Sequence, residues 1–349
     1  MKNDGVTEMK NRQIVFTAPG VAELLENEIP DTLKPNEVRV KTKYTAISSG
    51  TERANLIGEV NISGLRRLCN ADFPRKVGYC GVGVVEEVGS GVKKLKPGQR
   101  VIIYFGKHSE RNVIPEEKAV PIVPETLTDE EVALMVIGCF PENAIRKTRL
   151  ELGESVSVVG LGILGILAVQ FARAAGAVPV IGVDVNPDCR AKALKYGADY
   201  VVDPLEEGYE AKMKELTGGR GVDVTIEAAG NYNALNSALR CCAPMGRVAL
   251  LGCTRTPDVM DLYHDVHFPG VTLIGAHNFA RPVHDSYPGC WTYQDDLAAQ
   301  MRLQATGRIN MGSLISEVHS PEECPEVFGR LAKDKNFPAG VLFDWERLK

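Results

Sequence analysis

The sequence predicts an α/β protein of two domains, one irregular and β-rich and one built on a doubly wound parallel sheet. Turn residues separate short strands over residues 1–143. From Glu154 onward, short apolar strands alternate with helical stretches. A chain of 349 residues, 44% of them hydrophobic, is long enough to bury two separate cores.

The β-rich domain is predicted from runs of strand-forming residues with turns between them. Its expected strands are Arg12–Thr17, Glu37–Ala46, Gly81–Val88 and Arg100–Tyr104. Lys96-Pro97-Gly98 supplies a tight turn before the last of them. We also assign the C-terminal tail, residues 290–349, to this domain. The tail is expected to form helices over Leu297–Thr306 and Pro321–Lys333 and a strand over Gly340–Trp345.

The parallel-sheet domain is assigned to residues 144–289. Short apolar strands that alternate with helices indicate a parallel sheet with helices on both faces and right-handed crossovers. The expected strands are Ser155–Val159, Val178–Val183, Tyr200–Val202, Val222–Ile226, Arg247–Leu251 and Val271–Ile274. The expected helices are Ile166–Ala175, Cys189–Tyr196, Tyr209–Leu216 and Tyr232–Cys242.

Charge and hydropathy narrow the classes of partner. The formal net charge is −5, and no block of like charges occurs, which disfavours binding to nucleic acid or to an anionic membrane. Residues 1–12 are polar, and no later run approaches the roughly 18 apolar residues of a membrane span. We therefore expect a cytoplasmic protein with a small-molecule substrate.

The nine cysteines are scattered, and none forms the C-x-x-C pairs of a structural zinc site. We expect reduced, mostly buried thiols. They are Cys69, Cys80, Cys139, Cys189, Cys241, Cys242, Cys253, Cys290 and Cys324.

A glycine-rich turn gives the cofactor signal. Residues 160–165 read G-x-G-x-x-G directly after an expected strand and at the start of a helix. Gly160 allows a tight turn, Gly162 lets the backbone approach a pyrophosphate at the helix N-terminus, and Gly165 lets helix and sheet pack closely. Two alternatives to a dinucleotide site are that the glycines serve only the packing of strand and helix, or that the turn binds S-adenosylmethionine.

Asp184 ends the second strand of this domain, about 20 residues after the last glycine. A carboxylate there accepts hydrogen bonds from the adenosine ribose and repels a 2′-phosphate, so NAD is favoured over NADP. The full set of expected cofactor contacts is Gly160, Gly162, Ile163, Leu164, Gly165, Asp184, Val185, Ala228, Gly252 and Cys253.

The chain resembles the medium-chain dehydrogenase/reductase superfamily over nearly its whole length. The segment 96–101 is similar to that family's "PGDRV" turn, and 78–85 is similar to its "GHEGAGIV" strand. Leu152-Gly153-Glu154 leads into the nucleotide-binding strand as in family members. The resemblance implies a GroES-like catalytic domain and a Rossmann domain that binds NAD.

The departures from this family concern zinc. Ser49 stands where zinc-dependent members carry a cysteine, and Tyr79 and Cys80 replace the histidine and the acid of "GHE". The third-ligand region, Met135–Cys139, is ambiguous, and residues 102–121 lack the cysteines of a structural zinc lobe. We expect no catalytic zinc. Residues 48–52 and the C-terminal half resemble the bacteriochlorophyllide hydroxyethyl dehydrogenase subgroup.

Without zinc, hydrogen-bond donors or an acid/base group must handle the substrate oxygen. Thr51 resembles the family's proton-relaying hydroxyl, and the Tyr79 phenol can donate to an alkoxide or carbonyl. The alternatives are a turn-capping hydroxyl for Thr51 and a packed core aromatic for Tyr79. Glu52 with Arg53 is interpreted as an exposed or structural ion pair.

The segment 277–293 follows the last strand of the sheet and is rich in aromatic and hydrogen-bonding residues. This position predicts proximity to the nicotinamide end of the cleft, although such residues also line dimer surfaces. His277 and His284 are candidate general acids or bases. Candidate substrate-binding residues are Ser49, Asn278, Tyr287 and Trp291. A metal site at His264 and His267 is disfavoured because no further ligand lies nearby.

Together these features predict an NAD-dependent, zinc-free oxidoreductase that interconverts a secondary alcohol and a ketone, with a polyol, sugar or cyclic alcohol as substrate. The alternatives are an NAD(P)H-dependent enone or quinone reductase and a nucleotide-binding scaffold without activity. A homodimer is expected through edge pairing of the strand at Val271–Ile274.

Overall fold

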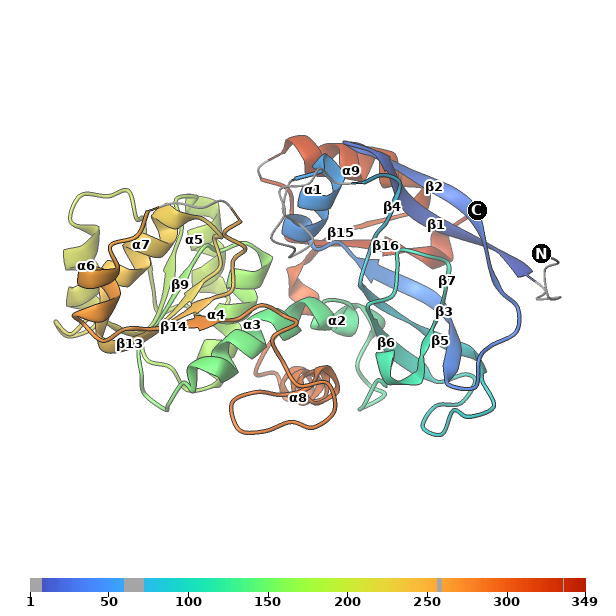
Figure 1. Cartoon of the computed structure of the whole chain (residues 1–349), viewed down its shortest axis with the longest axis horizontal. Coiled ribbons are helices and arrows are strands. Elements are labelled where there is room, and N and C mark those ends of the chain that lie inside the picture. Colours follow the sequence, from blue (N-terminus) through green and yellow to red (C-terminus); the bar gives the residue numbers. More distant parts are fainter. Residues whose placement is uncertain (1–7, 60–71, 256–258, 335) are drawn as a thin grey trace. The chain divides into compact units, whose positions relative to one another are not determined.

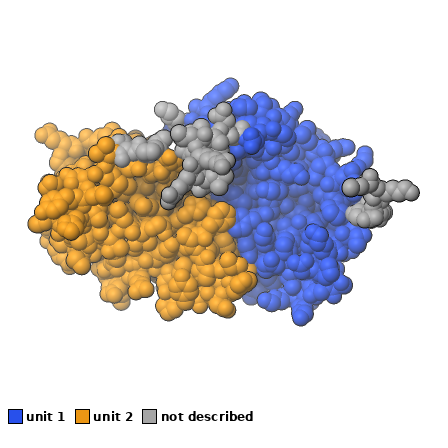
Figure 2. All heavy atoms as spheres, viewed as in Figure 1, with its two compact units in different colours: residues 1–136, 310–349 blue, residues 137–309 orange. Residues whose placement is uncertain are grey.

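The computed structural model describes residues 8–59, 72–255, 259–334 and 336–349. The chain forms two compact units (Figures 1 and 2). Unit 1 comprises Met1–Val136 and Asn310–Lys349, and unit 2 comprises Ile137–Ile309. The chain therefore leaves the first unit and returns to it, as the predicted split arrangement requires.

Unit 1 contains two β-sheets. A three-stranded antiparallel sheet has the order β2-β1-β4, and a larger sheet has the order β15-β16-β3-β5-β6-β8, with β7 paired to β3. The first sheet consists of β1 (Glu8–Ala18), β2 (Val21–Pro30) and β4 (Arg75–Lys76). The second consists of β3 (Glu37–Ala46), β5 (Cys80–Val88), β6 (Arg100–Tyr104), β7 (Arg111–Pro115), β8 (Ala119–Pro121), β15 (Ile315–His319) and β16 (Gly340–Asp344).

The core of unit 1 joins the two ends of the chain. Phe16 and Phe328 meet edge to face with their ring centroids 4.9 Å apart, and Phe343 packs beside Phe328 at 5.7 Å. The helices of this unit are α1 (Ser49–Ile57), α2 (Asp129–Ala133) and α9 (Cys324–Lys333), with 3-10 turns at Glu116–Lys118, Gly312–Leu314, Pro321–Glu323 and Trp345–Arg347. Burial of these aromatic rings ties the C-terminal segment to β1.

Unit 2 is a six-stranded parallel sheet with the order β11-β10-β9-β12-β13-β14. This is the order of a doubly wound nucleotide-binding fold, in which the direction of winding reverses between the first and fourth strands. The strands are β9 (Val156–Val159), β10 (Val180–Val183), β11 (Tyr200–Val202), β12 (Val222–Glu227), β13 (Cys242–Leu250) and β14 (Thr272–Gly275). All residues of β9 and β10 are buried, as expected when helices cover both faces.

The helices of this unit precede, separate and follow the strands. They are α3 (Met135–Thr148), which begins at the end of unit 1, α4 (Ile163–Ala174), α5 (Pro187–Lys195), α6 (Tyr209–Leu216), α7 (Tyr232–Cys241), the π-helix Tyr263–His267 and α8 (Tyr293–Ala305). The predicted α/β class is thus confirmed, with the β-rich unit and the parallel sheet both present.

The return to unit 1 lies at Asn310 rather than at residue 290 as predicted. The reason is α8, which packs in unit 2 through polar contacts. Asp296 accepts a hydrogen bond from Arg146 Nε at 2.7 Å, and Gln300 donates to Glu142 at 2.8 Å. These contacts tie α8 to α3. The helix also begins earlier than predicted, because the Thr292 hydroxyl caps it by accepting from the Asp295 N–H.

None of the eight described cysteines takes part in a disulfide, and Cys69 lies outside the described residues. Among the same residues, none of the helices combines the length and the apolar character that a membrane span requires.

Candidate active site

The glycine turn lies between β9 and α4, at the carboxyl edge of the sheet. Gly160 has φ +89°, and a Cβ there would lie 2.6 Å from the Ala229 nitrogen. A Cβ at Gly165 would lie 1.9 Å from the Gly160 carbonyl oxygen. Both positions therefore require glycine for backbone reasons.

Gly162 is different because a Cβ there would meet nothing within 4 Å. This residue is the N-cap of α4, and no side chain caps the helix. The first N–H groups of α4, which include those of Ile163 and Leu164, lack intrahelical partners, as at any helix start. An uncapped helix N-terminus beside open space fits a phosphate group.

Asp184 lies directly after β10 and is half-buried. Its Oδ2 accepts a hydrogen bond from the Leu161 N–H at 2.7 Å, and its Oδ1 accepts from the Asn186 N–H at 2.8 Å. The carboxylate thus links the glycine turn to the loop after β10. Val185 beside it is exposed. This position suits contact with a ribose next to a bound pyrophosphate.

Glu227, at the end of β12, was not predicted from the sequence. Its side chain is fully buried, and Oε1 accepts from the Gly230 N–H at 2.7 Å, while Oε2 has no partner in the described chain. Burial raises the pKa of its carboxyl, against hydrogen bonds from the backbone of Gly230 and Ala229. A carboxylate at the end of a buried strand is a signal that could have identified it.

Two backbone hydrogen bonds near Glu227 fix the positions of the other residues that were predicted to contact the cofactor. The Ala228 N–H donates to the Val159 carbonyl at 2.8 Å, and the Gly252 N–H donates to the Glu227 carbonyl at 2.7 Å. Cys253, which follows, is exposed. Ala228, Gly252 and Cys253 therefore lie just after the ends of β12 and β13, at the same edge as the glycine turn.

A second group of polar side chains lies in unit 1, around Tyr79. Its hydroxyl is buried, and burial raises the pKa of the phenol well above its ordinary value, while hydrogen bonding with Ser48 and Thr51 opposes part of that rise. Ser48 is the buried N-cap of α1, Ser49 is half-buried and Thr51 is exposed. We call Ser48, Thr51 and Tyr79 the hydroxyl cluster.

Glu52 does not pair with Arg53, so that interpretation is wrong. The Glu52 carboxylate is 2% exposed and lies 2.9 Å from Nε2 of His108, which is itself fully buried. The other carboxylate oxygen accepts from the Ser48 N–H at 3.2 Å. His108 was not identified from the sequence because it lies far from Glu52 along the chain and in no recognisable motif.

The cysteines near the family's zinc positions make other contacts. The Cys80 thiol donates to the Ala133 carbonyl at 2.9 Å. Cys139 is buried, which raises the pKa of its thiol, and Gln300 Nε2 lies 3.3 Å from its sulfur. Within the described ranges, no three His, Cys, Asp or Glu side chains are arranged to hold a metal ion. His264 pairs instead with Asp261 at 2.8 Å.

The segment after β14 divides into two parts. The Ala276 N–H donates to the Leu250 carbonyl at 3.2 Å, which keeps the following His277 and Asn278 at the carboxyl edge of the sheet. His277 is exposed, whereas Asn278 is 2% exposed and neither polar atom of its side chain has a partner among the residues described. His277 and Asn278 therefore lie at the same edge as the glycine turn and Asp184, which we call the cofactor edge.

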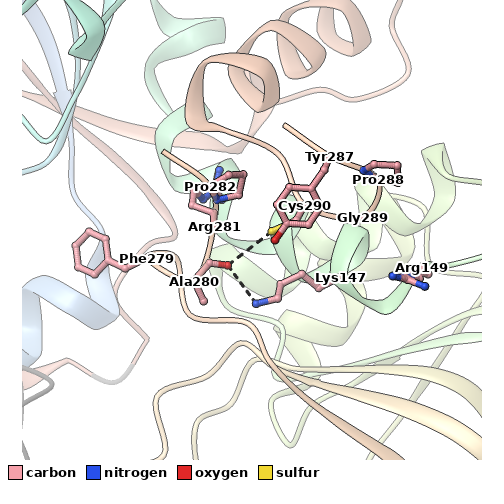
Figure 3. A pocket seen from close by; sticks show the side chains of 10 residues that line it. All are labelled: Lys147, Arg149, Phe279, Ala280, Arg281, Pro282, Tyr287, Pro288, Gly289 and Cys290. Carbon is pink, nitrogen blue, oxygen red and sulfur yellow. Dashed lines mark hydrogen bonds between the residues drawn. The ribbon is translucent and has the colours of Figure 1, made fainter. Parts of the chain in front are cut away.

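The rest of the segment lies along α3 and lines a pocket of about 470 Å³ (Figure 3). Tyr287 contributes an exposed ring, and Lys147 donates to the Ala280 carbonyl at 3.1 Å. The central guanidinium carbon of Arg146 lies over the Trp291 ring, 3.5 Å from the ring centroid. His284 is exposed. The pocket is lined by Lys147, Arg149, Phe279, Ala280, Arg281, Pro282, Tyr287, Pro288, Gly289 and Cys290.

Comparison with known proteins identifies the class. Residues 34–149 match the alcohol dehydrogenase GroES-like domain, and residues 164–291 match the zinc-binding dehydrogenase family. The chain is 30% identical over 298 residues to L-threonine 3-dehydrogenase of Pyrococcus horikoshii, covering 75% of this chain and 81% of that protein. The chain therefore belongs to the zinc-type alcohol dehydrogenase-like, medium-chain dehydrogenase/reductase superfamily, and it is an oxidoreductase by class.

Two further relatives cover more of the chain. D-guloside 3-dehydrogenase of Escherichia coli is 29% identical over 353 residues, with 95% of this chain and all of that protein aligned. A solved structure from Sinorhizobium meliloti, bound to NADP, superimposes with a TM-score of 0.78 at 24% identity and covers 96% of this chain and 99% of that one. The predicted combination of a GroES-like domain with a Rossmann domain is thus confirmed.

Proposed function

We propose that the protein is an NAD-dependent oxidoreductase that interconverts a secondary alcohol and a ketone without a catalytic zinc. The observation that carries the proposal is the uncapped α4 N-terminus beside the open Gly162, with the Asp184 carboxylate at the same edge. This arrangement fits a dinucleotide, which would supply the acceptor or donor of hydride.

The choice of NAD over NADP rests on charge. The Asp184 carboxylate would accept hydrogen bonds from ribose hydroxyls and repel a 2′-phosphate. Arg190 is the nearest cation on the following helix, but its guanidinium donates to the Asp184 carbonyl and to Asp203 at 2.9 Å. That engagement leaves it poorly placed to neutralise an added phosphate. Because the similar structure from Sinorhizobium meliloti was bound to NADP, the affinities of this protein for NAD and NADP must be measured directly.

The hydroxyl cluster would handle the substrate oxygen. Because its pKa is raised, Tyr79 stays a phenol at neutral pH and can donate a hydrogen bond to a carbonyl or alkoxide oxygen. Thr51, which is exposed, can exchange a proton between that oxygen and solvent. His277 and His284 remain alternative proton carriers, and both are exposed.

The residues at the family's zinc positions do not fit the metal. Zinc requires three N, S or O ligands from the protein around an open position, and ligands bind it in their deprotonated or neutral basic form. Ser49 offers a hydroxyl, and Tyr79 a phenol that resists deprotonation. We therefore assign no step to a metal ion.

A secondary alcohol on a sugar, polyol or ring is the substrate class that we propose. Two relatives are named as 3-dehydrogenases, one of a D-guloside and one of L-threonine. Ser49, Asn278, Tyr287 and Trp291 remain the proposed substrate contacts. We also propose a cytoplasmic homodimer that pairs through β14, an edge strand of the six-stranded sheet.

The test is turnover by the purified protein with NAD and a panel of sugars, polyols and cyclic alcohols, before and after dialysis against a chelator. We expect NADH to appear with at least one secondary alcohol and the rate to survive chelation. Activity lost on chelation and restored by zinc would overturn the zinc-free assignment. NADH consumption with enones or quinones alone would identify a reductase instead, and NADH binding without any turnover would identify a scaffold.

The cofactor assignment has its own test in Asp184→Ala. Loss of two charge-assisted hydrogen bonds to the ribose predicts roughly a 10- to 100-fold loss of NADH affinity by calorimetry. Affinity for NADPH should change far less, so the ratio of the two affinities must move. An unchanged ratio would contradict the role of Asp184.

A further inference from the structure

A buried carboxylate and imidazole lie together in unit 1, outside the groups used above. Glu52 and His108 are 2% and 0% exposed, and Oε2 lies 2.9 Å from Nε2. The His108 ring packs against Phe328 and Phe343, with centroids 6.1 and 5.6 Å away. Apolar side chains of similar volume would pack at least as well among these rings, because burying ionisable groups is costly.

The hydrogen bonds of this pair lead to the hydroxyl cluster. Glu52 Oε1 accepts from the Ser48 N–H at 3.2 Å, and so holds the first residue of the turn that carries Ser48 and Thr51. The backbone N–H of His108 donates to the Val77 carbonyl at 2.9 Å. In the same loop, the Phe105 N–H donates to the Tyr79 carbonyl at 2.8 Å. The pair therefore joins α1 to the loop that supports Tyr79.

The tautomer of His108 follows from its surroundings. Nδ1 is buried and has no hydrogen-bond partner among the described residues. A proton on Nδ1 would be a buried donor without an acceptor, which is unfavourable. We therefore place the His108 proton on Nε2, so that Glu52 accepts from both His108 and Ser48.

We infer that Glu52 and His108 act as a positioning pair, which holds the Ser48–Thr51 turn against the Tyr79 hydroxyl in the geometry that reaction at the substrate oxygen requires. This inference rests on the proposed function. Neither residue touches the reacting atoms. Their effect is on the placement of the hydroxyl cluster, and a displacement of about 1 Å at such a site costs on the order of 100-fold in rate.

The test compares His108→Phe with His108→Gln. Phenylalanine fills the space among the rings but removes the donor to Glu52, whereas a glutamine amide can still donate. We expect kcat to fall roughly 100-fold in His108→Phe and to be largely restored in His108→Gln. NADH affinity should stay unchanged in both, because the proposed cofactor contacts lie in unit 2.

A double-mutant cycle and a matched control complete the design. Glu52→Ala should lower kcat as much as His108→Phe, and the double variant should lose no more than either, because the two act as one unit. The control is His319, which also contacts two carboxylates in unit 1, Glu317 and Glu323, each at 2.8 Å. His319→Phe and His319→Gln should leave kcat unchanged.

Two results would overturn the inference. One is an active protein in which His108→Phe lowers the melting temperature but leaves kcat at the wild-type value, because the pair would then be only structural. The second result is sought if the wild type turns over no alcohol, because the proposed function has then failed and kcat cannot be compared. Hydrogen exchange then decides: amides of residues 48–52 must exchange faster in His108→Phe than in His319→Phe, and equal rates would remove the pair's positioning role.

Discussion

The cofactor edge of unit 2 and the hydroxyl cluster of unit 1 are built in different ways. At the cofactor edge, backbone geometry defines the site, because a Cβ at Gly160 or Gly165 would collide with main-chain atoms. In unit 1, side chains from separate segments define it, and their placement depends on the contact between Glu52 and His108. A backbone site tolerates few residue types, whereas a side-chain site can be rebuilt with other groups.

This difference explains how the family fold can persist while the chemistry at its centre changes. The parallel sheet holds the glycine turn and Asp184 in place whatever the substrate is. If Ser49 and Tyr79 stand in place of a cysteine and a histidine, as proposed, the surrounding strands are kept while the groups that the site offers to a ligand differ. The hydroxyl cluster, and not the fold, therefore limits the chemistry that the protein can perform.

The largest effect that we predict is for Tyr79→Phe. Removal of the phenol hydroxyl takes away the proposed donor to the substrate oxygen, so kcat should fall by roughly 10²- to 10⁴-fold. The KM for NAD should change little because the proposed cofactor contacts lie elsewhere. Steady-state kinetics with the best alcohol from the panel measures both quantities.

Tyr44→Phe is the matched control, since that phenol donates to Glu130 at 2.9 Å in the same unit and lies outside the hydroxyl cluster. Its kcat should match that of the wild type. If Tyr79→Phe also kept full activity, the proposed role of Tyr79 as donor to the substrate oxygen would be wrong. Thr51 or a histidine would then have to supply that hydrogen bond.

The cofactor edge could be predicted from the sequence because its signals are local. Strand, glycines and helix follow one another within residues 156–174, and the strands β3, β6 and β11 match their predicted bounds. The contact between Glu52 and His108 could not be predicted, because it depends on how distant segments pack. The helix α3 was missed for another reason, namely that Pro141 lies inside it and conceals its periodicity.

A pair of glycine variants tests whether backbone geometry defines the cofactor edge. Gly162→Ala places a methyl group in open space, so the melting temperature should hold while NADH affinity falls about 10-fold, or ~1.4 kcal/mol, because the methyl lies where a pyrophosphate would approach. Gly165→Ala drives a Cβ to within 1.9 Å of the Gly160 carbonyl oxygen and should cost about 1–3 kcal/mol of stability.

Thermal unfolding and NADH titration separate the two effects. Gly329→Ala serves as the control, because a Cβ at that position in α9 also meets nothing within 4 Å. It should leave NADH affinity unchanged and raise stability slightly, as alanine favours helix over glycine. Equal NADH affinity in Gly162→Ala and the wild type would argue against a phosphate at the α4 N-terminus.

The last prediction concerns a buried network that the sequence did not indicate, in which Asp296 accepts from Arg281 and so holds the segment after β14. Burial, and next the nearby Asp296 carboxylate, raise the pKa of Glu142 from 4.5 to about 8, although Arg146 and Gln300 hydrogen-bond to it. The folded state therefore binds this proton more tightly than the unfolded state does. Its contribution to stability is complete below pH 4.5 and is lost as the pH rises toward 8.

Glu142→Gln removes this titration but can keep the hydrogen bonds. The amide oxygen can accept from Arg146, and the amide nitrogen can donate to Gln300 Oε1, which has no partner in the described chain. The free energy of unfolding of the variant, relative to the wild type, should rise with pH between 4.5 and about 8 and then level off. Urea titrations across this range measure it, with Glu207→Gln, at an exposed position before α6, as the control. A pH-independent difference would show that Glu142 keeps an ordinary pKa, and the network would then be a simple set of ion pairs.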